Sequence, residues 1–583
     1  MASLTEILHR VQKPGRYIGE ETNVVKKEWS PQKISVALAY PDTYEIGMSY
    51  LGLKILYHLL NEQDDILCER VFAPWPDMEG ELRAAGMPLY GLESKRPLRD
   101  FDIVGFSLSY ELTYSNVLNM LDLGGISVLS EKRREDEPLV IAGGACCFNP
   151  EPMSAFVDVF FIGDAEETLP EFIRRYRELK GSGAGKRDAL KELSGRGGVY
   201  VPGLYEPLYA AEKFSGLKKL DDSAPERIFK ASVADLDKAY YPVKQIVPLV
   251  RVVHDRIAVE VMRGCPNRCR FCQASAVNRP VRIRSVGKIR DLCRRSYLNT
   301  GYESVALLSL SSVNYPHLSE LVKGLGEDLG SQGVGVSIPS LRVDEAFYDI
   351  PEMLSAIKKA GLTFAPESAN AGTRRAIGKD IDVEVLCKAA LAAYENGWKG
   401  LKLYFMVGFP LDDIEEAANI LSLARRLSSL RREKAKGPAE IKLSVNPFVP
   451  KPQTAFQWLG MKDPGSLETI RAELMRGASK RVKVDFHDIK RAVLEAALSR
   501  GDRRTGRAVY GAWKSGAKMD SWSDYFNPET WEDSFRAVGM DMREEAEKRF
   551  SMDDELPWGH VGVSTDTSGL KREFQLSGLA DAL

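Results

Sequence analysis

The sequence predicts an α/β protein with a doubly wound parallel sheet, then an open (β/α)6 partial TIM barrel, then a mostly helical C-terminal region. Three observations predict this order. Apolar runs typical of buried strands alternate with helical segments from residue 34, and again from residue 257. A Gly- and Lys-rich stretch at 180–198 separates the two series. The last part of the chain loses the alternation and carries runs of opposite charge.

Residues 1–30 form a polar N-terminal extension, and residues 31–198 carry the first series of strands and helices. The expected strands are Ile34–Ala39, Ile66–Phe72, Ile103–Leu108, Leu139–Ala142 and Val157–Ile162. The expected helices are Tyr50–Leu60, Met78–Ala85, Asn116–Leu123 and Glu166–Leu179. Five such units match the doubly wound, flavodoxin-like (Rossmann-type) arrangement. Residues 199–250 are less regular, and we expect a bridge there.

Residues 251–465 carry the second series. Its expected strands are Ile257–Met262, Ser304–Leu310, Val334–Ile338, Leu362–Pro366, Leu401–Val407 and Ile441–Val445. Six units are too few to close an eight-stranded barrel, so we expect an open one. In barrels of this kind the chemistry lies at the C-terminal ends of the strands.

Residues 466–583 form the C-terminal region, where we expect helices. Residues 476–518 hold twelve Lys or Arg against four acids, and residues 519–556 hold twelve acids against four bases. The basic stretch could bind RNA through its phosphates and by stacking on aromatic side chains. It could equally pair with the acidic stretch, and the equal and opposite excesses favour that pairing.

The composition is that of an ordinary globular protein, with a formal net charge of −2 over 583 residues. This balance argues against a protein that coats nucleic acid along its whole surface. No run approaches the roughly 18 apolar residues of a membrane span, and the first residues lack an apolar signal core. The cysteines show no disulfide framework. We therefore expect a cytoplasmic protein without membrane contact.

Three cysteines follow the first strand of the second series, at Cys265, Cys269 and Cys272. Three thiolates on one short loop can bind three corners of a [4Fe–4S] cluster, which normally takes four cysteines. The missing fourth ligand leaves one iron open for a small molecule. Zinc is a weaker alternative, because it usually takes paired Cys-x-x-Cys or His ligands and the nearest histidine, His254, lies upstream.

This Cys-x-x-x-Cys-x-x-Cys pattern, with the aromatic Phe271 before the last cysteine, resembles the signature of radical S-adenosylmethionine (radical SAM) enzymes. The resemblance implies a [4Fe–4S] cluster whose open iron binds S-adenosylmethionine (SAM). It further implies a low-potential electron donor, and cleavage of SAM to methionine and a 5′-deoxyadenosyl radical.

The same resemblance implies SAM contacts at Phe271 in the motif and at the ends of four strands. The strand-end residues are Ser309 and Ser311 after the second strand, Ser340 and Arg342 after the third, Glu367 after the fourth, and Gly408 and Pro410 after the fifth. Arginine suits the SAM carboxylate because its planar fork binds carboxylates through two hydrogen bonds. The Gly-Gly-Glu that the family usually carries after the second strand is absent. For each residue alone, an ordinary strand-end turn remains the alternative.

The first domain resembles the cobalamin-binding domain that precedes the radical SAM domain in a large subclass. The residues that carry this resemblance are Asp42, Tyr44, Gly47, Ser107, Gly143 and Gly144. Tyr44 stands where a histidine would coordinate cobalt, and a protonated phenol is a poor ligand. The resemblance therefore implies cobalamin without a lower histidine ligand, a state that suits radical methyl transfer. The alternative is a doubly wound domain that keeps its glycines for turns and binds nothing.

Two further groups of residues have open interpretations. Cys146 and Cys147 follow the glycine pair, and packing is favoured over a redox role because small buried thiols are common. Six arginines crowd the cysteine motif, at positions 263, 268, 270, 279, 282 and 284. They could balance the charge of a cluster, attract an anionic substrate such as RNA, or form an ordinary solvated loop.

Lys13–Gly19 and Pro557–His560 resemble one bacterial subfamily of these B12-binding-domain radical SAM proteins. Its members often accompany a small domain of unknown function, which implies a small partner protein. We expect a radical SAM enzyme, with cobalamin-assisted methylation of an unactivated carbon in RNA or a translation component. Radical sulfur insertion, as in methylthiotransferases, is a rival that normally needs further cluster ligands. A non-catalytic iron–sulfur sensor or binding protein is the other rival.

Overall fold

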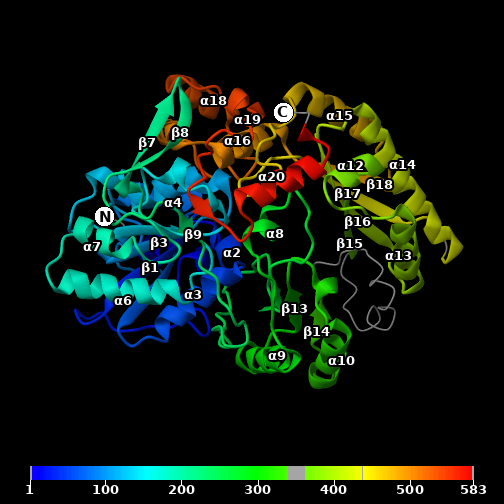
Figure 1. Ribbon diagram of the computed structural model, residues 1–583. Helices are drawn as coiled ribbons and strands as arrows, with labels where there is room; N and C mark the ends of the chain where they lie inside the picture. The colour runs from blue at the N-terminus through cyan, green and yellow to red at the C-terminus, as the bar shows by residue number, and fades with distance from the viewer. Residues whose placement is uncertain (1–2, 339–361, 436, 581–583) are drawn as a thin grey trace.

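The computed structural model describes residues 3–338, 362–435 and 437–580. Figure 1 shows the N-terminal domain in blue and cyan, the barrel in green to yellow, and the C-terminal helices in orange and red across both. The predicted α/β class and the order of its parts are confirmed.

A six-stranded sheet forms the centre of the N-terminal domain, in the order β2-β1-β3-β4-β5-β6. Its first five strands are parallel, and their order is that of the doubly wound, flavodoxin-like topology. The strands are β1 (Ile34–Tyr40), β2 (Ile66–Phe72), β3 (Ile103–Ser107), β4 (Leu139–Gly143), β5 (Val159–Phe161) and β6 (Val199–Tyr200). The helices are α1 (Leu4–Leu8), α2 (Tyr44–Gly47), α3 (Leu51–Asn61), α4 (Pro76–Ala85), α5 (Tyr114–Leu123), α6 (Thr168–Gly181) and α7 (Lys186–Leu193). Every residue of β1 is buried, as expected for a strand of a sheet covered on both faces.

The bridge after this domain contains short strands that join neighbouring parts. Its first strand, β6, pairs antiparallel with β5 and completes the N-terminal sheet. A hairpin follows, formed by β7 (Tyr205–Ala210) and β8 (Lys213–Lys219). Next comes β9 (Ile228–Phe229), which pairs with β19 (Val561–Gly562) near the C-terminus. The bridge is therefore joined by strand pairing to the N-terminal sheet and to the C-terminal region.

The barrel consists of two parallel sheets, β10-β13-β14 and β15-β16-β17-β18. Its strands are β10 (Ile257–Glu260), β13 (Ser304–Leu308), β14 (Gly335–Ser337), β15 (Leu362–Glu367), β16 (Gly400–Val407), β17 (Glu440–Pro447) and β18 (Val482–Phe486). Its helices are α8 (Gln273–Val277), α9 (Val286–Thr300), α10 (Leu318–Leu329), α12 (Ala371–Ala376), α13 (Val383–Glu395) and α14 (Ile414–Leu430). Six of the strands coincide with the six that the sequence predicts.

The seventh strand, β18, lies in the stretch where the sequence analysis expected helices. It pairs in parallel with β17 and extends the sheet past residue 465. Its sequence, Val-Lys-Val-Asp-Phe, alternates apolar and charged residues with the period of a strand that has one face in water. The charge excess of residues 476–518 concealed this short period.

The rest of the C-terminal region is helical and packs across both preceding domains (Figure 1). Its helices are α15 (Pro464–Arg476), α16 (Ile489–Arg500), α17 (Arg503–Lys514), α18 (Pro528–Ala537), α19 (Met542–Glu547) and α20 (Thr567–Leu576). α17 contacts α5 of the N-terminal domain, and the Asn149 side chain donates hydrogen bonds to the carbonyls of Ser499 and Gly501, both at 2.9 Å. No helix in the described ranges is both long enough and apolar enough to span a bilayer.

Candidate active site

The cysteine motif lies on one loop, residues 264–281, which we call the cluster loop. β11 (Met262–Arg263) and β12 (Arg282–Ile283) pair antiparallel and close this loop at its base. Gly264 opens it with φ 87°, and a Cβ there would lie 2.7 Å from the carbonyl oxygen of Asn278. Glycine is required here because the turn is left-handed and the far end of the loop approaches closely.

The three cysteines have surroundings that suit thiolate ligands. Cys265 is buried, whereas Cys269 and Cys272 are half-buried. Asn267 Nδ2 donates to Cys265 Sγ at 3.3 Å, and the backbone N–H of Ser275 donates to Cys272 Sγ at 3.4 Å. Burial raises the pKa of the Cys272 thiol to about 11, so a bound metal would have to displace its proton.

Among the residues that the structure describes, no group of three or more His, Cys, Asp or Glu side chains is arranged to hold a metal ion. The ligands of a structural zinc ion surround one centre, whereas the cysteines of an iron–sulfur cube bind different iron atoms.

Hydrogen bonds tie the cluster loop to the end of the second barrel strand. Asn267 Nδ2 donates to Asn314 Oδ1 at 2.9 Å, and Ser311 Oγ donates to the same oxygen at 2.7 Å. The hydroxyl of Ser309 bonds that of Ser312 at 2.9 Å. Two amide side chains thus connect Ser311 with the first cysteine of the motif.

The turn after β16 reaches the cluster loop through an aromatic residue that the sequence analysis missed. Asp412 Oδ2 accepts the backbone N–H groups of Gly408 and Phe409, both at 3.0 Å. Gly408 has φ 97°, and the buried ring of Phe409 lies 6.4 Å from that of Phe271. Pro410 is exposed. The contact between turn and loop is therefore made by Phe409, between the two predicted residues.

Glu367 ends β15 in an unusual backbone conformation. Its φ is 66°, and the register of β15 with β16 shifts between Phe364 and Glu367. Its carboxylate accepts from Lys379 Nζ at 2.7 Å, in a pair that is mostly buried. Strained non-glycine residues are found preferentially at functional sites. Ser340 and Arg342 lie outside the described residues.

A cavity of about 350 Å³ lies between the N-terminal sheet, α3 and the cluster loop, and we call it the interdomain pocket. Three of the predicted cobalamin residues line it: Ser107, Gly143 and Gly144. Its floor is largely apolar, with Leu38, Ile55, Phe106, Ile141 and Phe161 among the lining residues. Val277 and Asn278 of the cluster loop line it as well. One cavity therefore adjoins three of the predicted cobalamin residues and the loop that carries the cysteines, while the cysteines themselves do not line it.

A cluster of charged groups at this pocket was missed from the sequence. Arg263 contacts three carboxylates, those of Asp164 at 3.1 Å, Glu166 at 2.7 Å and Glu260 at 3.0 Å. Arg282 Nη1 lies 2.6 Å from the other oxygen of Asp164. Both arginines flank the cluster loop, so the ion pairs fasten that loop to the N-terminal domain. The acidic run Gly-Asp-Ala-Glu-Glu after β5 was the feature of the sequence that could have predicted these partners for the arginines.

Tyr44 and Gly47 do not line the pocket. Tyr44 is fully buried, and its hydroxyl donates to Glu21 Oε1 at 2.8 Å, beside the buried Arg70. Burial raises the pKa of its phenol, which therefore stays protonated. Gly47 packs against Phe72, whose ring would lie 2.3 Å from an added Cβ. Tyr44 and Gly47 therefore contribute to the packing of the N-terminal domain.

Asp42 also faces away from the pocket. Its carboxylate accepts from the indole N–H of Trp522 at 2.9 Å and from the Ser521 hydroxyl at 3.1 Å. Burial raises the pKa of this carboxyl group. Asp42 thus anchors the C-terminal region to the edge of the N-terminal sheet.

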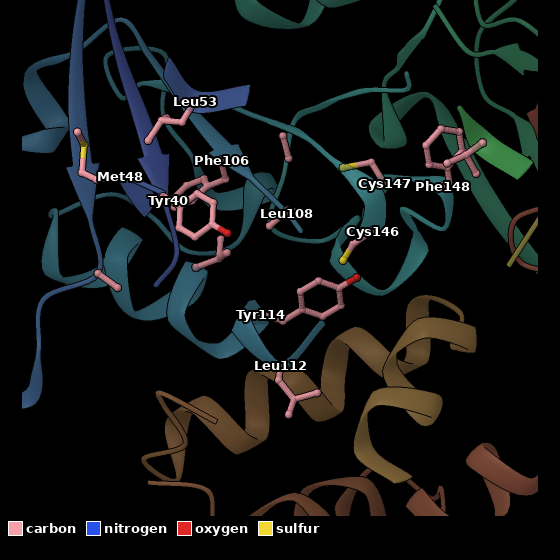
Figure 2. Close-up of a cluster of buried hydrophobic side chains, with 14 of the residues drawn as sticks. Tyr40, Met48, Leu53, Phe106, Leu108, Leu112, Tyr114, Cys146, Cys147 and Phe148 are labelled. Atoms are coloured by element: carbon pink, nitrogen blue, oxygen red, sulfur yellow. The ribbon is translucent and has the colours of Figure 1, made fainter. Parts of the chain in front are cut away.

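Cys146 and Cys147 are buried in the core at this same edge. Figure 2 shows the Cys146 sulfur directed toward the Tyr114 hydroxyl, with the Cys147 side chain pointing elsewhere. Burial raises the pKa of both thiols far above neutrality. Because reactivity needs the thiolate, the structure supports a packing role.

Part of the basic stretch 476–518 forms ion pairs within the protein. In the described chain, five of its cations form ion pairs: Arg476, Lys483, Arg503, Arg504 and Lys518. Their partners are Glu473, Glu440, Glu151, Asp502 and Glu79. None of these carboxylates lies in the acidic stretch 519–556, so the expected pairing between the two stretches is replaced by pairing with other elements.

Comparisons with known proteins agree with this architecture. Residues 52–202 match the family model described as radical SAM proteins, N-terminal, and residues 259–424 match that of the radical SAM superfamily. An uncharacterized protein of Methanocaldococcus jannaschii is 26% identical over 475 residues, which cover 81% of this chain and 90% of the relative.

Two solved structures share the fold over most of the chain. Both are of the radical S-adenosylmethionine methyltransferase TsrM from Kitasatospora setae. The structure with cobalamin and a [4Fe–4S] cluster bound has a TM-score of 0.54 at 11% identity, and covers 87% of this chain and 100% of that one. The structure with tryptophan substrate and a SAM analogue bound has a TM-score of 0.51 at 11% identity, and covers 87% and 99%. At this identity the likeness is one of fold.

Proposed function

This chain is a radical SAM enzyme, and from that premise we propose that it transfers a methyl group to an unactivated carbon with the help of cobalamin. The observation that carries the proposal is the interdomain pocket. One wall comes from the glycine-rich edge of the N-terminal sheet, and another comes from the cluster loop. A cofactor seated there would lie beside the site of radical formation.

The cluster loop supplies the first part of the proposed chemistry. Cys265, Cys269 and Cys272 would hold a [4Fe–4S] cluster, with Asn267 and the N–H of Ser275 donating to the sulfurs. Bound there, the cluster supplies the electron that cleaves SAM. Ser309, Ser311, Glu367 and the turn at Gly408 are proposed to bind SAM, because they end the strands around this loop.

The interdomain pocket fits part of a cobalamin molecule. A cavity of about 350 Å³ holds a small organic group, so it would take only part of so large a cofactor. Gly143 allows close approach, because an added Cβ would meet its nearest neighbour only at 3.7 Å. Cobalamin held there would act as the methyl carrier. Tyr44 donates its hydroxyl to Glu21 and does not line the pocket, so it is not proposed to hold the cofactor.

The structure adds no support for RNA as the substrate. Five of the twelve cations in residues 476–518, one of the stretches that suggested it, form ion pairs within the described protein. The sulfur-insertion alternative gains no support either. In the described chain Cys68, Cys146, Cys147, Cys293 and Cys387 are all buried in the core, away from the cluster loop.

The proposal is tested with anaerobically reconstituted protein, SAM and a strong reductant. Release of 5′-deoxyadenosine is expected, and hydroxocobalamin should bind with a shift of its visible spectrum. Cys269→Ala should lose the cluster absorbance but still bind hydroxocobalamin, whereas Cys387→Ala serves as the control and should keep both. Protein that carries a full cluster yet neither cleaves SAM nor binds hydroxocobalamin would contradict the proposal.

A further inference from the structure

The cluster loop borders a second cavity, of about 600 Å³, which we call the outer pocket. Cys269 and Cys272 line it, whereas the buried Cys265 does not. Its other walls are Phe229 and the C-terminal segment 563–573. The described strand-end residues proposed to bind SAM are not among those lining it.

Arginines dominate the charge of the outer pocket. Four line it, Arg268, Arg270, Arg279 and Arg572, against two carboxylates, Asp566 and Glu573, which leaves an excess of two positive charges. The whole chain has a net charge of −2, so this excess is local.

The two carboxylates are already engaged within the protein. Glu573 accepts from Arg270 Nε at 3.2 Å, and Asp566 accepts the backbone N–H of Gly569 as the cap of α20. Arg268 and Arg572 are exposed, and neither forms an ion pair in the part of the chain that the structure describes. Both guanidinium groups are accessible to a partner. The pKa of the Asp566 carboxyl in the same pocket is lowered by the hydrogen bond from Gly569 and also by the charge of Arg572.

The outer pocket also has an apolar rim. The Phe229 side chain is 62% exposed, and Val563 and Leu570 lie in the same wall. Exposed aromatic rings beside unpaired arginines are typical of protein–protein contact surfaces. Nucleic acid would need a longer track of cations than four side chains around one cavity.

We propose that the outer pocket docks an acidic, low-potential electron-transfer protein that carries a flavin or an iron–sulfur centre. The inference rests on the proposed cluster at Cys265, Cys269 and Cys272. The docked protein loses one electron and the cluster gains it, and no bond or proton changes place in this step. Cys269 and Cys272, which reach this surface, provide the short route between the two centres.

The test compares Arg268→Glu/Arg572→Glu with wild-type protein and with the control Arg187→Glu, an exposed arginine on α7 without an ion pair in the described chain. Reduced flavodoxin is the protein donor, and photoreduced 5-deazariboflavin is the small uncharged one. Stopped-flow absorbance measures cluster reduction, and calorimetry measures flavodoxin binding.

We expect the double variant to be reduced by flavodoxin at least 10-fold more slowly at low salt and to bind it correspondingly more weakly. The difference should shrink as salt is added. Reduction by deazariboflavin should be equal in all three proteins, and Arg187→Glu should match wild type throughout.

An unchanged flavodoxin rate and affinity in the double variant would overturn the docking proposal while leaving the proposed function intact. Arginine-dependent binding of a single-stranded RNA oligonucleotide, without flavodoxin binding, would overturn it in favour of RNA. If deazariboflavin reduces no cluster in any of the proteins, the proposed function fails. The flavodoxin affinities then decide the docking proposal by themselves.

Discussion

Gly143 and Gly144 are neighbours at the end of β4 with different structural roles. Gly144 has φ 118°, and a Cβ there would lie 2.4 Å from the carbonyl oxygen of Leu108. Gly143 has room for a Cβ within the fold. The first glycine thus leaves space for a ligand, and the second makes a turn that no other residue fits.

Gly144→Ala should destabilise the protein by roughly 1–3 kcal/mol, because alanine is strained at this φ and clashes with the backbone. Denaturant unfolding followed by circular dichroism measures the change.

Gly143→Ala is the matched control, and it should fold normally while weakening hydroxocobalamin binding through its new methyl group. Equal stability of the two variants would show that the turn at Gly144 is not constrained as described. Undiminished binding to Gly143→Ala would place the ligand elsewhere.

Asp520 is a buried carboxylate that accepts from the Ser115 hydroxyl at 2.6 Å and from the Trp531 indole at 3.0 Å. Burial raises its pKa from 3.8 to about 6. Between these values the folded state holds a proton that the unfolded state has lost. Asp520 therefore makes the protein less stable as the pH rises from about 4 to 6.

Asp520→Asn should remove this contribution, on the order of 2 kcal/mol, while keeping the shape of the side chain. The difference in unfolding free energy between variant and wild type should shift in favour of the variant from pH 4.5 to pH 7. A difference that is constant over this range would show that Asp520 does not titrate in it.

At the scale of elements, the β11–β12 pair is fastened to the loop after β5 by Asp164. This carboxylate contacts Arg263 at 3.1 Å and Arg282 at 2.6 Å, in surroundings that are largely buried. Removing one member of a buried ion pair leaves an uncompensated charge, which typically costs about 3–5 kcal/mol.

Asp164→Asn should therefore loosen the cluster loop and speed the loss of iron to a chelator several-fold, as followed by absorbance. Asp122→Asn is the control, because its ion pair with Arg83 is exposed and contributes about 0–1 kcal/mol. Equal iron loss in both variants would argue against the fastening role.

At the scale of the whole molecule, Lys451 joins three parts. Its ammonium lies 2.8 Å from Glu111 of the N-terminal domain and 2.8 Å from Glu495 of α16, while Lys451 itself follows β17. The two carboxylates would repel each other without it, and burial raises the pKa of Glu111.

Lys451→Met should lower the thermal midpoint by several degrees and open the domain junction to limited proteolysis. Adding Glu111→Gln should recover much of the loss, because it removes the repulsion. If the double variant is as unstable as the single one, the charge of Lys451 is not what joins the domains.

Much of this architecture could be predicted from the chain alone. β1 is a buried run that is apolar except for Ser35, with polar residues on each side, and the cysteine motif lies directly after the first strand of the second series. Such patterns involve only residues that are close in the sequence, so they can be recognised without knowledge of the fold. They gave the order of the domains and the identity of the cluster loop.

What could not be predicted depends on side chains that are distant in the sequence. Arg263 forms an ion pair with Asp164, which lies 99 positions earlier in the sequence. Tyr44 occupies a position of the cobalamin motif, but the direction of its side chain is set by packing in the folded domain. β18 was missed because its alternation is short and lies within the strongly charged stretch 476–518. The composition of a stretch does not say which contacts its individual residues make.

The interdomain pocket shares a wall with the loop that carries the proposed metal ligands, through Val277 and Asn278. In protein reconstituted with the proposed cluster and cobalamin, loss of iron in air should loosen that wall. The corrinoid should therefore be released together with the iron during aerobic handling.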